Sequence, residues 1–355
     1  QPEQIHLSLT GDPSEMMVTW ATMARTNNSF VEFGLRGQPL GSKVDAEVSK
    51  FRTCGVKKRT IWIHRAKLEG LVPSEGYDYR CGGDHGWSAI YTFNASNAGS
   101  DWSPSFAVAL RTITLCIGGH GNARRTITLC IGGHGSARHT ITLCIGGHDF
   151  AYDMASDMAR VGDAFMNQIE TMAAYTPYMV CPGNHEHACN FSDYRKRFSM
   201  PGGTEGIFYS WNIGPAHIIS FSTEVYYFLQ FGIEQLVQQY KWLQKDLEEA
   251  NLPHNRAQRP WIITMGHRPM YCSNIVGDGC QNHENAIRTG ITSLKLFPLE
   301  ELFYKHGVDL QLYGHEHSYE RLYPVYQHKI YKGSEEEPYT NPKAPVHLTS
   351  GSAVS

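Results

Sequence analysis

The segment Trp261-Ile262-Ile263-Thr264-Met265-Gly266-His267-Arg268-Pro269 decides the fold class of this 355-residue chain. Its first five residues form a run typical of a buried strand, and a glycine and a histidine follow directly. Residues 308–312 form a similar run before Gly314-His315-Glu316-His317. Because the apolar residues of 158–172 and 233–247 have helical spacing, helices are expected between such strands. The pattern predicts an α/β domain over residues 104–355, with ligands bound beyond the carboxyl ends of its strands.

Residues 1–98 have a different pattern, which predicts an all-β domain. Short runs of alternating apolar and polar residues are separated by turn residues at 4–9, 17–20, 30–33, 62–66, 77–81 and 89–93. Their number and spacing predict a fibronectin-III-like sandwich with its aromatic residues packed in the core. The stretch Asn97-Ala98-Gly99-Ser100, followed by Pro104, is interpreted as a linker.

Composition and charge exclude several classes of protein. Hydrophobic residues make up 41% of the chain, which is normal for a globular protein and excludes a disordered one. Thirty-one basic and 34 acidic residues give a net charge of −3, which argues against a partner such as nucleic acid or an anionic membrane. The chain contains no run of about 18 apolar residues, so no membrane span is expected. The sequence leaves the oligomeric state open.

Several features indicate an oxidising compartment. N-glycosylation sequons begin at Asn27, Asn94 and Asn190. Cys272 and Cys280 flank a short Gly- and Asp-rich loop that a disulfide can close, whereas the pairing of the other cysteines stays open. The chain begins with glutamine and without a basic-then-apolar leader, so we expect that a signal segment was removed or that the sequence starts late. Together these features predict a secreted, extracellular or luminal glycoprotein.

A tandem repeat with a 14-residue period occupies residues 111–148. The segment RTITLCIGGHGNAR at 111–124 recurs at 125–138 with one substitution, and a shortened third copy follows at 139–148. Fourteen residues are too few for an ordinary solenoid repeat. Each copy predicts a strand followed by a Gly-Gly turn. The near-identity of the copies indicates a recent duplication or an assembly error.

Short clusters of metal-binding residue types follow the predicted strands of residues 104–355. Each lies where a strand turns into a loop, so the clusters can meet at one edge of a sheet. A carboxylate can bridge two cations, while imidazoles and an amide oxygen complete their coordination. A single cluster of this kind more often belongs to a surface loop without a metal. The four clusters together predict a two-metal site. The clusters are Asp149 with Tyr152, Asn184 with His185, His267, and His315 with His317.

These clusters resemble four of the five metallophosphoesterase blocks of the purple acid phosphatases. Tyr152 is the most specific element, and the run Cys181-Pro182-Gly183-Asn184-His185-Glu186 is similar to the animal long-form branch of that family. The resemblance covers nearly the whole chain. It implies two domains, a fibronectin-III-like all-β sandwich over 1–98 and an α/β metallophosphoesterase β-sandwich flanked by helices over 104–355.

The resemblance also implies an activity and a cofactor. The protein would be an acid phosphatase that hydrolyses phosphate monoesters with an Fe(III) ion, a divalent Zn or Fe(II) ion and a bridging hydroxide that attacks phosphorus. His185 would sit beside the phosphate and protonate the leaving oxygen. His283 is a second candidate for that role. It is equally well interpreted as an exposed histidine in a loop without a catalytic function.

The family pattern assigns a metal to each of the other clustered residues. Asp149 would bridge the two ions. Tyr152 and His317 would bind the ferric ion, since a phenolate oxygen suits a hard trivalent cation. The divalent ion would be bound by Asn184, His267 and His315.

The chain departs from the family at its first block, Gly-Asp-x-Gly, which supplies another ferric ligand. No aspartate occurs between Leu110 and His148, because the repeat takes the place of that block and of the crossover helix, and His148 stands where the family has glycine. Gly83-Asp84-His85-Gly86 contains the motif, but it lies in the sandwich and is interpreted as a hairpin turn. The loss predicts impaired activity. His120 and His134 are alternative ligands that we do not favour.

The C-terminal end departs from the family as well. Residues 346–352 predict a strand and a turn, whereas the family continues with further strands, so the catalytic domain is expected to be incomplete there. Two other functions stay open. One is a phosphodiesterase on the same scaffold, and the other is a catalytically inert secreted glycoprotein whose sandwich binds a partner.

Overall fold

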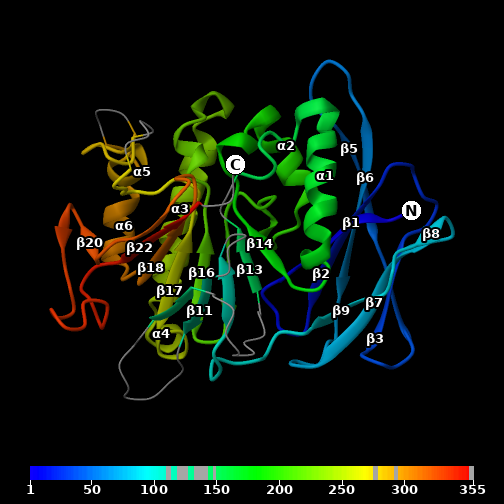
Figure 1. Ribbon diagram of the computed structural model, residues 1–355, viewed down its shortest axis with the longest axis horizontal. Helices are drawn as coiled ribbons and strands as arrows, with labels where there is room; N and C mark the ends of the chain where they lie inside the picture. The colour runs from blue at the N-terminus through cyan, green and yellow to red at the C-terminus, as the bar shows by residue number, and fades with distance from the viewer. Residues whose placement is uncertain are drawn as a thin grey trace.

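The computed structural model describes residues 1–108, 113–117, 127–131, 143–146, 149–274, 279–291 and 295–351. Within them, an N-terminal β-sandwich is followed by a mixed α/β region, as the sequence predicts (Figure 1). None of the helices in these ranges combines the length and apolarity that crossing a membrane requires.

The N-terminal sandwich consists of two antiparallel sheets. One has the strand order β1 (Glu3–Ser8), β2 (Met16–Thr22), β6 (Thr60–Leu68), β5 (Glu47–Arg52). The other has the order β4 (Ser42–Asp45), β3 (Phe30–Leu35), β7 (Gly76–Gly83), β8 (Gly86–Trp87), with β9 (Tyr91–Asn94) also paired to β7.

Sequence alternation predicts this sandwich well where one face of a strand is buried. Trp20 and Tyr79 are fully buried in its core, and Gly83 pairs with Gly86 in the predicted hairpin turn. The sequence did not indicate β4 and β5, because most of their side chains are exposed and carry no apolar alternation. Their pairing to neighbouring strands is a tertiary effect.

The first sheet of the α/β region incorporates the repeat. Its order is β12 (Ile127–Ile131), β11 (Ile113–Ile117), β10 (Ser105–Val108), β13 (Leu143–Gly146), β14 (Tyr178–Val180). The first two copies form an antiparallel pair, whereas the third supplies β13, which runs parallel to β10 and β14. The predicted repeat strands are confirmed, and the predicted Gly-Gly turns at 118–119 and 132–133 lie outside the described residues.

The second sheet carries the segment that decided the fold class. Its order is β15 (Tyr209–Ile213), β16 (Ala216–Ser220), β17 (Trp261–Met265), β18 (Leu310–Tyr313), β22 (Val346–Ser350), β19 (Tyr319–Arg321). Strands β16, β17, β18 and β22 are parallel. A separate hairpin joins β20 (Val325–Tyr326) and β21 (Lys329–Ile330).

Alternate residues of the parallel strands belong to two cores. Ile218 and Ile263 lie in a hydrophobic cluster that also contains Met179 of β14 and residues of the N-terminal sandwich. Ile219 and Ile262 lie in a second cluster with residues of the helices. Both faces of the sheet are therefore covered, which explains why these strands are continuous apolar runs. The helices are α1 (Ser156–Ala173), α2 (Ala188–Arg197), α3 (Glu234–Ala250), α4 (Pro253–Gln258), α5 (Ala286–Thr289) and α6 (Leu299–Lys305).

Helix α1 buries Ile169 as predicted, but its other fully buried residues lie one position after the remaining residues of the predicted stripe. The sequence predicts Met158, Val161, Phe165, Ile169 and Met172, but the buried residues are Ala159, Gly162, Met166, Ile169 and Ala173. Small residues are needed there, because a Cβ atom on Gly162 would lie 2.9 Å from the Met154 carbonyl oxygen and 3.1 Å from the Arg197 side chain.

Helix α1 lies beside β1 and links the two parts of the molecule (Figure 1). Arg197 of α2 is 1% exposed, and its Nη1 donates to Oδ1 of Asp163 in α1 and to Oε1 of Gln4 in β1, both at 2.9 Å. The backbone N–H of Ile5 donates to Oε2 of Glu170 at 3.0 Å. Buried charged hydrogen bonds therefore cross this interface together with the shared hydrophobic cluster.

Candidate metal centre

The predicted metal ligands lie on loops that follow the carboxyl ends of four strands. Asp149 follows β13, and Asn184 begins the 3₁₀ turn η1 (Asn184–Glu186) after β14. His267 follows β17, and His315 follows β18. Because β13 is parallel to β14 and β17 is parallel to β18, each pair of loops leaves its sheet at the same edge. The backbone N–H of Gly314 donates to the His267 carbonyl oxygen at 2.9 Å and ties two of the loops together.

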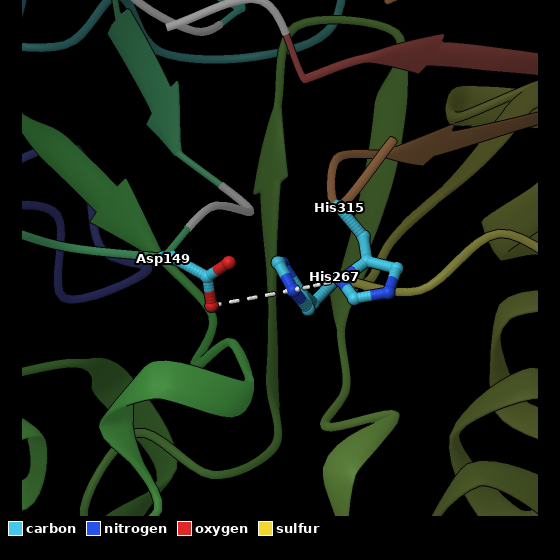
Figure 2. Close-up of side chains that lie close together, drawn as sticks. All are labelled: Asp149, His267 and His315. Atoms are coloured by element: carbon cyan, nitrogen blue, oxygen red, sulfur yellow. Dashed lines mark hydrogen bonds and ion pairs between the residues drawn. The ribbon is translucent and has the colours of Figure 1, made fainter. Parts of the chain in front are cut away.

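His267 lies at the centre of the predicted cluster. Its Nε2 is 3.0 Å from Oδ1 of Asn184, 3.0 Å from Nδ1 of His315 and 3.3 Å from Oδ1 of Asp149. Figure 2 shows the three titratable side chains, with His267 between Asp149 and His315. One ligand atom from each of these three lies within 4.8 Å of the others. His267 is fully buried and the Asp149 side chain is 6% exposed.

The residues present fit a cation. An imidazole nitrogen carries either one proton or one lone pair, so Nε2 of His267 cannot satisfy two oxygens and another ring nitrogen at once. A cation among these atoms would use a carboxylate, two imidazoles and an amide oxygen as ligands. Gly183 leaves this space open, because a Cβ atom there would lie 2.3 Å from Oδ1 of Asp149 and 2.9 Å from Cε1 of His267.

Tyr152 and His317 form a second pair beside the cluster. The Tyr152 hydroxyl is 2.6 Å from Nε2 of His317. Burial and the negative charge of Asp149 raise the pKa of the Tyr152 phenol. Tyr152 follows Asp149 through a turn in which Ala151 and Tyr152 have φ angles of 59° and 40°. This left-handed turn brings a phenol back towards the carboxylate that precedes it by three positions.

The two predicted catalytic histidines lie in different surroundings. The His185 ring is 30% exposed, its centroid is 4.3 Å from that of Tyr152, and its Nδ1 is 3.1 Å from Oδ1 of Asp153. Its backbone N–H donates to Oδ1 of Asp149 at 3.0 Å, so His185 adjoins the cluster. His283 instead stacks on His328, with ring centroids 4.8 Å apart, and no described contact joins its ring to the cluster.

A buried ion pair supports His315 from behind. Glu224 is fully buried, and both of its carboxylate oxygens accept hydrogen bonds from Nε of Arg268 at 3.1 Å. Nη1 of Arg268 is 3.0 Å from Nε2 of His315, and the guanidinium lies over the Tyr227 ring. Burial raises the pKa of the Glu224 carboxyl, and the Arg268 charge opposes that rise. His315 itself has a φ of 61°, so its backbone conformation depends on such neighbours.

A second buried carboxylate organises the other side of the cluster. Glu186 is 2% exposed and accepts hydrogen bonds from the backbone N–H groups of Phe150 at 2.8 Å and Gly183 at 2.9 Å. Burial, and secondarily the charge of Asp149, raise the pKa of the Glu186 carboxyl well above its usual range. Glu186 therefore fastens the Asp149 loop to the Asn184 loop.

Sequence reasoning missed several of these supporting residues. Arg268 directly follows a predicted ligand and Asp153 directly follows Tyr152, but an isolated charge beside a ligand has no diagnostic spacing. Glu224 also follows a strand, as the ligands do, and this position is the one signal in the sequence that could have identified it. The residues that the sequence singled out within the repeat, His120, His134 and His148, lie outside the described residues.

Family comparisons agree with this geometry. Residues 2–95 match the model of the purple acid phosphatase N-terminal domain, and residues 120–319 match that of the calcineurin-like phosphoesterases. Acid phosphatase type 7 of Danio rerio is 51% identical over 99% of this chain and 78% of its own length. The chain belongs to the purple acid phosphatase family. The human acid phosphatase type 7 is 49% identical over the same shares of the two chains.

The plant members of the family and a solved structure are more distant. Purple acid phosphatase 18 of Arabidopsis thaliana is 28% identical over 99% of this chain and 70% of its own length. The structure of the purple acid phosphatase PPD1 from yellow lupin matches with a TM-score of 0.69 and 23% identity, covering 99% of this chain and 64% of the lupin chain. That match supports the shared fold. Family membership confirms the resemblance found in the sequence and implies a dinuclear metal centre.

Proposed function

We propose that this chain is an acid phosphatase that hydrolyses phosphate monoesters with one Fe(III) and one divalent ion, Zn or Fe(II). The observation that carries the proposal is the convergence of Asp149, Asn184, His267 and His315, with Tyr152 and His317 beside them. The type 7 acid phosphatases, about half identical to this chain, support the same reaction class.

The ligand roles are those that the family pattern implies, and the chemistry of the side chains is compatible with them. Asn184, His267 and His315 would hold the divalent ion, because amide oxygen and neutral imidazole suit a borderline cation. Tyr152 and His317 would hold the ferric ion, and Asp149 would contact both. When bound, the two ions would supply Lewis acidity and lower the pKa of water, so that a nucleophile is available in mild acid.

His185 is the proposed proton donor to the leaving oxygen. Its Nδ1 faces the Asp153 carboxylate, which as an anion can only accept, so Nδ1 carries a proton and orients the ring. Nε2 is then the atom that gives a proton to the departing alkoxide. Asp153 holds the ring in this orientation. His283 stays a second candidate for this role on sequence grounds.

We also propose that activity is impaired by the missing first aspartate, and that the protein is secreted or luminal. Tyr152, His317 and Asp149 would hold the ferric ion with one anionic ligand fewer than the family pattern provides. The compartment is supported by the Cys272–Cys280 disulfide, which was predicted from the sequence and is present, and by exposed sequon residues Asn27 and Asn94. The third sequon residue, Asn190, is half-buried.

A metal-reconstitution assay tests the proposal. The purified chain, loaded with iron and zinc, is expected to hydrolyse p-nitrophenyl phosphate faster than bis(p-nitrophenyl) phosphate, with an optimum in mild acid. His267→Ala should abolish this activity. Faster hydrolysis of the diester would favour the phosphodiesterase, and metal binding without any hydrolysis would contradict an enzymatic role.

A further inference from the structure

Two cysteines that the metal centre does not use face each other across the interface between the sandwich and the α/β region. Cys54 lies in the loop between β5 and β6, and Cys189 is the second residue of α2. The Cys54 thiol interacts with the Cys189 thiol and with the side chains of Ser192 and Asp193, also in α2. The two cysteines are far apart in sequence, so tertiary packing brings them together.

Contacts on both sides of this loop hold it against the α/β region. The Arg197 guanidinium of α2 lies over the ring of Phe51, which is three positions before Cys54. Nε of Arg59, five positions after Cys54, donates to the Met158 carbonyl oxygen at 3.2 Å. Arg59 also pairs with Asp163 of α1. Anchors on either side of Cys54 therefore keep its thiol close to α2.

The accessibility of the Cys54 and Cys189 thiols differs from that of Cys81 and Cys181. Cys189 is exposed and Cys54 is half-buried. Cys81 and Cys181, which also lie outside a disulfide, are both fully buried. Cys272 and Cys280 already form a disulfide with each other. Cys54 and Cys189 thus combine mutual proximity with access to an oxidant.

We propose that Cys54 and Cys189 form a disulfide that joins the N-terminal sandwich to helix α2. The proposal does not depend on the proposed phosphatase function. The oxidant is a low-molecular-weight disulfide such as oxidised glutathione. The Cys189 thiolate attacks it, forms a mixed disulfide and releases one thiol. The Cys54 thiolate then attacks Sγ of Cys189 and releases the second thiol, so that two protons and two electrons pass to the oxidant.

The order of the two steps follows from the surroundings of each thiol. Burial, reinforced by the neighbouring Cys189 thiol, raises the pKa of Cys54 to about 11. Cys54 is therefore almost entirely protonated at neutral pH and is the poorer initial nucleophile. The exposed Cys189 is the residue that an external disulfide reaches first.

The cross-link would close a loop of roughly 135 residues, for which chain-entropy models give a large stabilisation. It would also hold the first turn of α2, where Cys189, Asn190 and Phe191 all have φ angles between 51° and 61°. This turn begins two residues after η1, which carries Asn184 and His185. The disulfide would consequently anchor the sandwich next to one of the metal-binding loops.

Peptide mapping of the unmodified protein decides whether the bond forms. The purified chain is treated with oxidised glutathione, alkylated and digested without reductant. We expect one linked pair of peptides that contains Cys54 and Cys189 and separates on reduction. The Cys272–Cys280 pair serves as the internal control for oxidation. Alkylated Cys54 and Cys189 in a sample where Cys272–Cys280 is intact would overturn the proposal.

Thermal unfolding tests the consequence. The oxidised wild type is expected to unfold on the order of 5 °C or more above the Cys54→Ser and Cys189→Ser variants treated in the same way. These variants keep Cys272–Cys280, so the comparison isolates one bond. Equal melting temperatures would contradict the anchoring role. If a variant fails to fold, the peptide map of the wild type still decides whether the disulfide exists.

Discussion

Nε2 of His267 lies 3.0 Å from Oδ1 of Asn184, although 83 positions separate the two residues. The contact joins the loop after β14 in one sheet to the loop after β17 in the other. Each of the two loops is placed by the strand before it. The meeting of the two sheet edges therefore creates the metal-binding geometry.

Replacement of a central histidine is expected to remove the divalent ion. His267→Ala and His315→Ala each delete one of three proposed nitrogen and amide-oxygen ligands, which should lower metal affinity by more than the roughly 10–100-fold that supporting residues contribute. Elemental analysis after equilibrium dialysis measures the loss, and circular dichroism should show the sandwich still folded. His217→Ala is the matched control, since His217 pairs with Asp246 at 2.9 Å, outside the cluster. Unchanged metal content in both test variants would refute the ligand assignment.

Filling the space beside Gly183 should disturb the site without removing a ligand. In Gly183→Ala, the new Cβ would lie 2.3 Å from Oδ1 of Asp149, so the carboxylate must move. We expect a destabilisation of about 1–3 kcal/mol in denaturant unfolding and weaker metal binding. Gly41→Ala is the control, because its Cβ would meet only the Pro39 carbonyl oxygen, at 3.9 Å. Equal metal affinity in the two variants would show that the crowding is relieved elsewhere.

Restoring the first block should recover the ferric site. Replacement of the repeat after Leu110 by a Gly-Asp-x-Gly turn and a crossover helix adds one anionic oxygen ligand for a trivalent ion. Iron content, a tyrosinate-to-iron absorption band and phosphatase activity are expected to rise together. The unmodified chain should be a poor phosphatase. Two metals per molecule and a purple or pink colour in the unmodified chain would show that another residue already supplies the ligand, and His120 and His134 would then be mutated.

The phenol of Tyr152 should be the source of that colour. Tyr152→Phe, made in the restored chain, removes the oxygen that lies 2.6 Å from Nε2 of His317 and keeps the ring. We expect the visible band to disappear while the protein stays folded. Tyr175→Phe is the control, because Tyr175 is an exposed tyrosine that packs against Tyr91. A band that persists in Tyr152→Phe would exclude this phenol as an iron ligand.

The sandwich should lose stability in acid because of a buried histidine. His64 is fully buried, its ring nitrogens face the hydroxyls of Thr22 and Ser29 at 2.8 Å, and burial lowers its pKa from 6.5 to about 4. Because the folded protein favours the neutral ring, the unfolded chain takes up a proton at a higher pH than the folded one. The stabilisation that neutral His64 provides is therefore complete above about pH 6.5 and declines as the pH falls towards 4. At pH 4 the free energy of unfolding should therefore be about 3 kcal/mol lower than at neutral pH.

Denaturant unfolding between pH 7 and pH 4 measures this slope. His64→Gln, which keeps polar atoms for the two hydroxyls, should flatten it and lower stability at pH 7. His254→Ala, a substitution at an exposed histidine outside the sandwich, is the matched control. An equally steep decline in His64→Gln would assign the acid sensitivity to other groups, of which the buried His6 and His347 are the next to test.

Local pattern predicted most elements and few of their contacts. The apolar run 261–265 indicated β17, and the alternation around Trp20 indicated β2. In both cases the residues of the strand alone carry the pattern that identifies it. The exposed strands β4 and β5 have no such periodicity and were missed. In α1, Ile169 was predicted correctly, whereas Gly162 was missed because only its contact with the Arg197 side chain shows that a small residue must face inward there.

The sequence by itself determined which residues have ligand chemistry and that each follows a strand, because residue type and local periodicity are properties of neighbouring positions in the chain. Only the tertiary structure decided that His267 meets Asn184, that Arg268 and Glu224 support His315, and that Cys54 faces Cys189. These contacts join residues from different strands, loops and helices. Their distances depend on how the sheets and helices pack against one another, and no local pattern records that packing.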